Sequence, residues 1–183
     1  MNGDEPRTAT RIAVIGGPGS GKTTVAGTLA RQLGIPHIEL DGIFHLPDWH
    51  ELPVDEFRAR LAHVVAEDSW IVDGNYSAVA DLVWARAQCV IWLDLPRPLV
   101  MRRLLRRTLT RMARREELWH GNRERWSNLT SLDPQRSILV WAWTRHGRYR
   151  ERYAAASVDP ANAHITVVRL TTPAAIDRYL AEQ

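Results

Sequence analysis

The sequence has few of the features that stabilise secreted or membrane-bound proteins. Its single cysteine, Cys89, excludes an internal disulfide, and no set of cysteines and histidines has the spacing of zinc ligands. No apolar run approaches the roughly 18 residues of a transmembrane helix. The polar N-terminal segment lacks the apolar core of a signal peptide. We therefore expect a cytoplasmic protein with no membrane contact.

Lysine is almost absent too. Of the 24 lysine and arginine residues, all but Lys22 are arginines, and seven of these arginines lie between Met101 and Arg115. The net charge of +3 is too small to indicate nucleic-acid binding by itself. A lone lysine indicates a position that requires a compact ammonium group on a flexible chain, because the planar guanidinium group of arginine is larger and needs a fork-shaped partner.

Lys22 belongs to a glycine-rich segment. Residues 16–23 read GGPGSGKT and match the phosphate-loop pattern G-x-x-x-x-G-K-[ST], with an apolar strand pattern before it and a helical pattern after it. In such a loop the backbone N–H groups and the helix N-terminus bind phosphate, and the lysine reaches the β- and γ-phosphates. The hydroxyl of Thr23 is expected to bind Mg²⁺. The residues expected to contact ATP are Gly17, Gly19, Ser20, Gly21, Lys22, Thr23 and Thr24.

Strand and helix patterns alternate along the chain. Strands that are apolar throughout and are separated by helices are typical of a parallel sheet whose two faces are covered by helices. We therefore expect an α/β fold with a five-stranded parallel sheet, in one domain over residues 1–183. The expected strands are residues 12–15, 37–40, 70–74, 89–96 and 164–170.

Several segments together resemble the adenylate-kinase-like small P-loop kinases. They read GGPGSGKTT, LD after the second strand, WIVDGNY, VIWLDLPR and WHGNRERW, and they extend from residue 11 almost to the C-terminus. The subgroup that they resemble most is known as the DNA topology modulation proteins. This resemblance implies an ATP- and Mg²⁺-dependent transfer of the γ-phosphoryl group to a small acceptor, a nucleotide or nucleoside. It also implies an acceptor-binding region at 41–69 and a lid at 99–126.

Two carboxylates are candidates for the chemistry. Asp73 is predicted at the carboxyl end of a strand, where doubly wound sheets bind ligands, and it can hold Mg²⁺ together with Thr23. Asp41 follows the second strand, where related kinases keep an acidic residue that faces the acceptor, and it can accept or orient the proton of a hydroxyl group. Either aspartate can instead be a turn residue, since each precedes a glycine.

The arginine-rich segment after Pro98 is predicted to form an amphipathic helix. Met101, Leu104, Leu105, Leu109 and Met112 would share one face and the arginines the other. Like charges four residues apart weaken a helix by about 0.2–0.5 kcal/mol per pair, and a bound anion relieves this repulsion. By the resemblance, the lid arginines that act on phosphate are Arg103 and Arg107, followed by Arg111, Arg114 and Arg115.

The identity of the acceptor stays open. Where the best-known adenylate kinases carry an arginine two residues after DG, this chain reads DGNY, so AMP would need Arg58 or Arg60 as its clamp. Four residues can enclose a planar base or can simply pack in the core: Phe44, His45, Trp49 and Tyr76.

Two other functions compete for the arginine face. It can lie along a nucleic-acid backbone in an ATP-binding regulatory protein that hydrolyses ATP slowly. It can also be a solvated surface that pairs with acids such as Glu116 and Glu117. No nucleic-acid-reading motif is present, so we favour the kinase.

Overall fold

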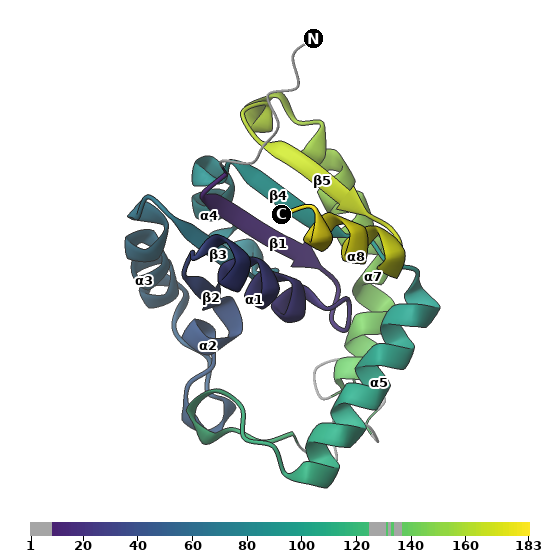
Figure 1. Ribbon diagram of the computed structural model, residues 1–183. Helices are drawn as coiled ribbons and strands as arrows, with labels where there is room; N and C mark the ends of the chain where they lie inside the picture. The colour runs from purple at the N-terminus through teal and green to yellow at the C-terminus, as the bar shows by residue number, and fades with distance from the viewer. Residues whose placement is uncertain (1–8, 125–130, 132, 134–136) are drawn as a thin grey trace.

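The computed structural model describes residues 9–124, 131, 133 and 137–183. Strands and helices alternate along most of the chain (Figure 1). The strands are β1 (Arg11–Gly16), β2 (His37–Glu39), β3 (Trp70–Asp73), β4 (Cys89–Leu93) and β5 (Thr166–Leu170). The helices are α1 (Lys22–Leu33), α2 (Leu40–Phe44), α3 (Val54–Ala66), α4 (Ala80–Arg86), α5 (Arg97–Arg114), α7 (Ile138–Ser157) and α8 (Pro173–Ala181). Short 3-10 helices cover η1 (Pro47–Trp49), η2 (Ser77–Val79), η3 (Trp119–Gly121) and η4 (Pro160–Asn162).

The five strands form one parallel sheet in the order β2-β3-β1-β4-β5. The predicted α/β fold is therefore confirmed. The registry aligns Val14 with Asp73, and Gly16 with Leu93. The chain leaves β1 and β3 at the same edge, so the phosphate loop and Asp73 lie close together, as expected at the carboxyl ends of parallel strands.

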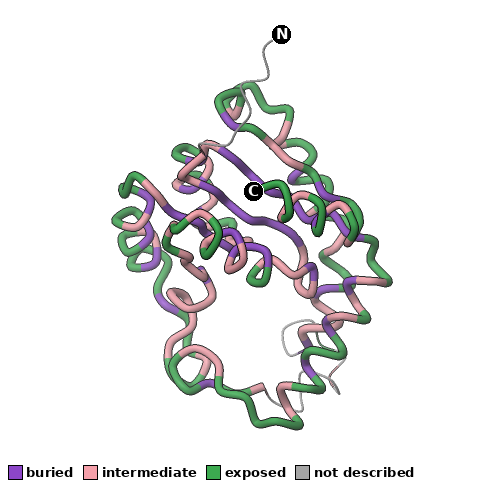
Figure 2. Tube along the Cα trace, viewed as in Figure 1, coloured by how far each residue is buried: buried purple, intermediate pink, exposed green. Residues whose placement is uncertain are grey.

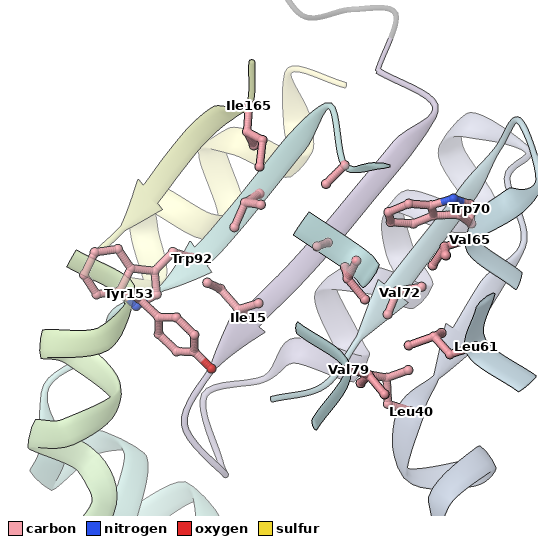
Figure 3. Close-up of a cluster of buried hydrophobic side chains, with 14 of the residues drawn as sticks. Ile15, Leu40, Leu61, Val65, Trp70, Val72, Val79, Trp92, Tyr153 and Ile165 are labelled. Carbon is pink, nitrogen blue, oxygen red and sulfur yellow. The ribbon is translucent and has the colours of Figure 1, made fainter. Parts of the chain in front are cut away.

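Alternate residues of each strand supply two cores, one on each face of the sheet. On one face, Trp70, Val72 and Trp92 pack against α3, α4 and α7. Figure 3 shows Trp92 beside Tyr153 of α7, and the ring centroids are 6.0 Å apart. On the other face, β-strand residues pack against α1 and α8. The central strands are buried on both sides (Figure 2), which explains why their sequences are continuously apolar.

Some element boundaries differ from the prediction. The strand that we expected at residues 37–40 ends at Glu39, and Asp41 lies in the first turn of α2. The helix expected from about residue 133 begins at Ile138. Within α5, Leu105 and Leu109 are exposed, and the residues that are buried are Val100, Leu104 and Thr108. The apolar stripe is therefore narrower than predicted, because only the N-terminal part of α5 packs on the sheet's flank.

Helix α5 runs away from the sheet, and the chain after it returns to α2 (Figure 1). The last two residues of the lid predicted at 99–126 lie outside the described residues. No described helix is both long enough and apolar enough to cross a membrane.

Candidate active site

The phosphate loop connects β1 to α1 and is shaped by its glycines. Gly19 has a φ of 82°, and a Cβ atom there would lie 2.6 Å from the carbonyl oxygen of Val100, so this backbone fits under α5 only without a side chain. The Ser20 N–H donates to the carbonyl of Gly17 at 3.1 Å. The Ser20 hydroxyl is buried inside the loop and has no partner. The N–H groups of the first turn of α1 have no side-chain cap, which leaves a cradle suited to an anion.

Lys22 is the first residue of α1, and its ammonium group folds back over the loop to donate to the Gly17 carbonyl at 3.4 Å. Burial lowers its pKa, and the nearby Arg107 acts in the same direction, while Asp41 and Asp73 raise it. These four charged groups therefore share one site, although they come from four separate segments of the chain.

Asp73, the last residue of β3, is 4% exposed, and its Oδ2 atom has no hydrogen-bond partner among the residues that the structure describes. His37 Nε2 lies 3.4 Å from Oδ2, within ion-pair range but without hydrogen-bond alignment. Asp73 nevertheless raises the pKa of His37. Asp73 lies near Lys22, and Thr23, the residue after Lys22 in α1, is exposed and carries a hydroxyl group. A buried carboxylate oxygen beside such a hydroxyl suits a hard cation such as Mg²⁺.

The structure separates the lid arginines. Arg103 lies over the phosphate loop, with Nη1 at 3.5 Å from the Ser20 carbonyl. Arg107 lies near Lys22 and Asp41, and crowding by surrounding protein atoms lowers its pKa even though part of its side chain meets solvent. Arg111 instead forms ion pairs with Glu116 at 3.8 Å and Glu124 at 3.7 Å.

Arg114 lies in the last turn of α5 and is exposed, as is Arg115, which ends the helix with a φ of 48°. Arg114 is eleven residues beyond Arg103, a rise of about 16 Å along a helix. The structure thus brings Arg103 and Arg107 to the phosphate loop, while Arg111 faces the carboxylates of the returning chain.

The aromatic candidates divide between core and site. Phe44 packs against Phe57 and Tyr76, with ring centroids 5.2 and 4.7 Å apart, and so belongs to the core. The Tyr76 hydroxyl projects from this packing and donates to Asp41 Oδ1 at 2.6 Å. His45 Nε2 lies 3.3 Å from the same hydroxyl.

The chain that follows α5 docks on the acceptor region. Trp119 Nε1 donates to Glu39 Oε2 at 3.1 Å, and its indole ring is so close to Gly42 that a Cβ there would lie 2.8 Å from it. The buried Asn122 donates to the Leu46 carbonyl at 2.9 Å and accepts from the backbone N–H of Trp49, also at 2.9 Å. We call residues 117–123 the docking segment; residues 39–50 are its counterpart.

Both sides of this contact carry backbone strain. Trp49 and His120 have φ values of 61° and 57°, in the left-handed region that bulky residues rarely adopt. Such conformations persist where the surrounding contacts impose them, and they are frequent at functional sites. Trp49 therefore serves the contact with the docking segment, and its indole Nε1 donates to the Arg123 carbonyl at 3.0 Å.

Sequence reasoning missed the role of Asn75. Its side-chain oxygen accepts from the Gly16 N–H at 3.3 Å, and its amide nitrogen donates to the Gly16 carbonyl. Sequence reasoning also missed Trp119, Asn122 and His37. The GNY and GNRE segments were the only available signal, and neither motif reveals which backbone its asparagine contacts.

Arg58 and Arg60 are the candidate clamps for a monophosphate, and both side chains contact carboxylates. Arg58 contacts both carboxylate oxygens of Asp81, at 2.8 and 2.7 Å, and holds the pKa of that exposed carboxyl at about 2. Arg60 lies 3.8 Å from Glu56 on its own helix. Both contacts lie on the α3–α4 side of the molecule.

Comparisons with known proteins bear on the fold of this chain. The model of the ATPase family associated with various cellular activities (AAA) matches residues 12–95, which include the phosphate loop, Asp41 and Asp73 but less than half of the chain. No curated protein matches this sequence significantly.

Solved structures match over nearly the whole chain. Shikimate kinase from Bacteroides thetaiotaomicron has 17% identity and a TM-score of 0.53, with 96% of each chain covered. Shikimate kinase from Acinetobacter baumannii, solved with shikimate, has 17% identity and a TM-score of 0.52, with 96% of this chain and 90% of that chain covered. A gluconokinase from Sinorhizobium meliloti 1021 has 16% identity and a TM-score of 0.49, with 96% of each chain covered. The two shikimate kinase matches, whose TM-scores exceed 0.5, show the fold alone at this identity: this chain has the P-loop architecture found in small P-loop kinases.

Proposed function

We propose that this protein is an ATP- and Mg²⁺-dependent phosphotransferase that moves the γ-phosphoryl group of ATP to a hydroxyl group of a small acceptor. The observation that carries the proposal is the convergence of Lys22, Arg107, Asp41 and Asp73 beside the phosphate loop. The positive charges of Lys22 and Arg107 suit the transferring phosphoryl group. The Asp73 carboxylate suits a metal ion, and the Asp41 carboxylate suits the hydroxyl group of the acceptor. This combination fits phosphoryl transfer, in which positioning and charge neutralisation provide most of the catalysis.

Each residue has a role that follows from its chemistry. The loop N–H groups and Lys22 hold the phosphates, and Arg103 and Arg107 neutralise the charge that develops during transfer. Thr23 and Asp73 would hold Mg²⁺, which supplies charge neutralisation between the β- and γ-phosphates when bound. Asp41 accepts a hydrogen bond from the acceptor hydroxyl and orients it for attack. The docking segment excludes water from the site and so limits ATP hydrolysis.

The acceptor is an uncharged hydroxyl compound, with a nucleoside favoured over a nucleotide. The two arginines on which a monophosphate clamp would depend, Arg58 and Arg60, contact carboxylates on the α3–α4 side. The charges around Asp41 on the acceptor side include Glu39, and burial with the negative charge of Asp73 raises the pKa of Glu39. This negatively charged environment disfavours binding of an acceptor that itself carries a phosphate group. His45, Trp49 and Trp119 provide aromatic surfaces for a planar base.

The test is a screen of ATP consumption with nucleosides, nucleoside monophosphates, polyols and hydroxy acids as acceptors, with the phosphorylated product identified by ³¹P NMR. We expect acceptor-dependent ADP formation with an uncharged hydroxyl compound, at a rate about 10²–10³-fold lower in the Lys22→Ala variant. Turnover with monophosphates alone would contradict the choice of acceptor. Absence of transfer to every acceptor class, with the wild-type protein binding Mg-ATP, would contradict the phosphotransferase.

A further inference from the structure

A hydrogen-bonded chain leads from His45 through Tyr76 to Asp41. The Tyr76 hydroxyl lies 2.6 Å from Asp41 Oδ1 and 3.3 Å from His45 Nε2. Asp41 and His45 lie at opposite ends of the short helix α2, while Tyr76 follows β3. The contact therefore joins two segments that are 35 residues apart in the sequence.

The donors and acceptors in this chain can be assigned by counting protons. An ionised carboxylate only accepts, so the single hydroxyl proton of Tyr76 is donated to Asp41. The tyrosine oxygen must then accept from His45, which requires the tautomer with a proton on Nε2. In agreement with this tautomer, His45 Nδ1 is buried and has no hydrogen-bond partner in the described part of the chain, and burial lowers the pKa of His45, which favours the neutral ring.

Tyr76 is held rigidly. Its ring packs between Phe44 and Phe57, with centroids 4.7 and 5.2 Å away. Burial and the adjacent Asp41 carboxylate raise its pKa far above the ordinary value, so the hydroxyl stays protonated and remains a donor at any physiological pH. A rigid donor at one carboxylate oxygen fixes the rotation of the Asp41 side chain and leaves the second oxygen available to another partner.

The neighbouring residue contacts the other half of the site. Asn75 bonds both the N–H and the carbonyl of Gly16, at the start of the phosphate loop. Adjacent side chains in a single turn thus contact the phosphate cradle and the acceptor carboxylate. A Cβ atom on the preceding Gly74 would lie 2.7 Å from Leu40 Cβ, so this turn also packs directly against the start of α2.

We propose that Tyr76, supported by His45, is a positioning residue that orients the Asp41 carboxylate toward the acceptor hydroxyl, and that Asn75 fixes the distance between this carboxylate and the phosphate loop. This inference rests on the proposed function. It deepens that function by assigning the geometry of transfer to the Asn75–Tyr76 turn rather than to Asp41 alone.

The charged groups around Asp41 do not provide this orientation. Lys22 from α1, Arg107 from α5 and Glu39 from β2 interact with Asp41 electrostatically. A long-range charge changes the energy of a carboxylate but does not select one of its two oxygens. A directional hydrogen bond does, and Tyr76 supplies it at 2.6 Å.

The test is a double-mutant cycle on the enzyme with its acceptor, using Tyr76→Phe, Asp41→Ala and the combined variant. Tyr76→Phe keeps the ring packing and removes only the hydroxyl. We expect kcat to fall about ten- to a hundredfold, as small misplacements of reacting groups do, with the KM for ATP unchanged. In the Asp41→Ala background the same change should have almost no further effect, because the hydroxyl acts only through that carboxylate.

Three further variants and a control complete the experiment. His45→Gln keeps an N–H donor near the position of Nε2 and should retain most activity, whereas His45→Ala should resemble Tyr76→Phe. Asn75→Ala should lower kcat and raise the KM for ATP together, because it acts on the phosphate loop. Tyr179→Phe removes a hydroxyl from a residue that packs against the core cluster on the opposite face of the sheet, and it should leave kcat unchanged.

The outcome separates this inference from the proposed function. Transfer by the wild-type protein tests the function alone. Within an active enzyme, equal fold-losses for Tyr76→Phe in the wild-type and Asp41→Ala backgrounds would overturn the positioning role. So would a Tyr76→Phe variant with wild-type kcat, or a loss of activity shared equally by Tyr179→Phe.

Discussion

The side-chain oxygen of Asn122 accepts a hydrogen bond from the backbone N–H of Trp49 at 2.9 Å, although 73 residues separate them in the sequence. Together with the bond from Asn122 to Leu46, it holds the docking segment on the acceptor region. Access to the region around Asp41 therefore depends on a contact formed by very few side chains.

Asn122→Ala should loosen this contact. The change leaves the Trp49 N–H and the Leu46 carbonyl without their partner and should cost about 1–3 kcal/mol locally. We expect hydrogen exchange in residues 117–123 and 45–50 to accelerate about tenfold or more, with the sheet unaffected. His120→Ala, which removes one exposed contact to Gly42, is the matched control and should have a smaller effect.

Helix α5 should respond to nucleotide. Its clustered arginines repel one another, and a bound triphosphate relieves that repulsion, so protection across residues 102–124 should rise when a non-hydrolysable ATP analogue and Mg²⁺ are added. Equal exchange in both states would show that the arginine helix does not act as a lid.

Lys22→Ala should lower transfer by about 10²–10³-fold while the protein stays folded. Among the described residues the ammonium group bonds a single loop carbonyl, and its removal opens no core cavity. Lys22→Arg should fail as well, because the guanidinium is too large for the position of the ammonium group over the loop. Circular dichroism and the rate of transfer distinguish a lost function from a lost fold, and wild-type turnover in either variant would refute the role.

The arginines of α5 should affect phosphoryl transfer differently, according to the face of the helix on which they lie. Replacing Arg103 and Arg107 with alanine should lower transfer about 10³-fold or more. The exposed Arg102 and Arg106 are the matched pair, and their replacement should have little effect on transfer. If this helix instead binds nucleic acid, all four arginines should contribute to a salt-dependent affinity while transfer stays intact. DNA binding measured at several salt concentrations, beside the rate of transfer, separates the two results.

Asp73→Asn should raise the Mg²⁺ concentration needed for half-maximal activity about 10- to 100-fold. Binding of ATP without metal should change much less, because this carboxylate contributes only through the ion. An Mg²⁺ titration that overlays that of the wild type would assign Asp73 to a structural role with His37.

Cys89 should be unreactive in the folded protein. Burial raises the pKa of its thiol to about 11, so at pH 8 about one molecule in a thousand carries the reactive thiolate. Iodoacetamide should therefore modify it only after unfolding. Because the unfolded thiol loses its proton first, stability should fall as the pH rises from about 8.5 to 11. Chemical denaturation of the wild type and Cys89→Ala across this range measures the difference.

The local chemistry of the chain was sufficient for the fold class and the phosphate loop. Strands buried on both faces must be apolar throughout, and a loop that presents backbone N–H groups to phosphate needs glycines at set intervals, so both features appear directly in the sequence. Residues 16–23 and the buried strands β1, β3 and β4 could be recognised for this reason. The position of Asp73 at the carboxyl end of β3 followed from the same rule, since the carboxyl ends of parallel strands share an edge.

The rest of the site depends on contacts between distant segments, which no local pattern encodes. The sequence could not show that Asn75 bonds Gly16, that Tyr76 bonds Asp41, or that Trp119 and Asn122 close on the acceptor region. The arginines illustrate the same limit. Periodicity placed them on one helix face, but only tertiary packing turned Arg103 and Arg107 toward the phosphate loop and directed Arg111 to Glu124, because each side chain's partner depends on where other elements end in space.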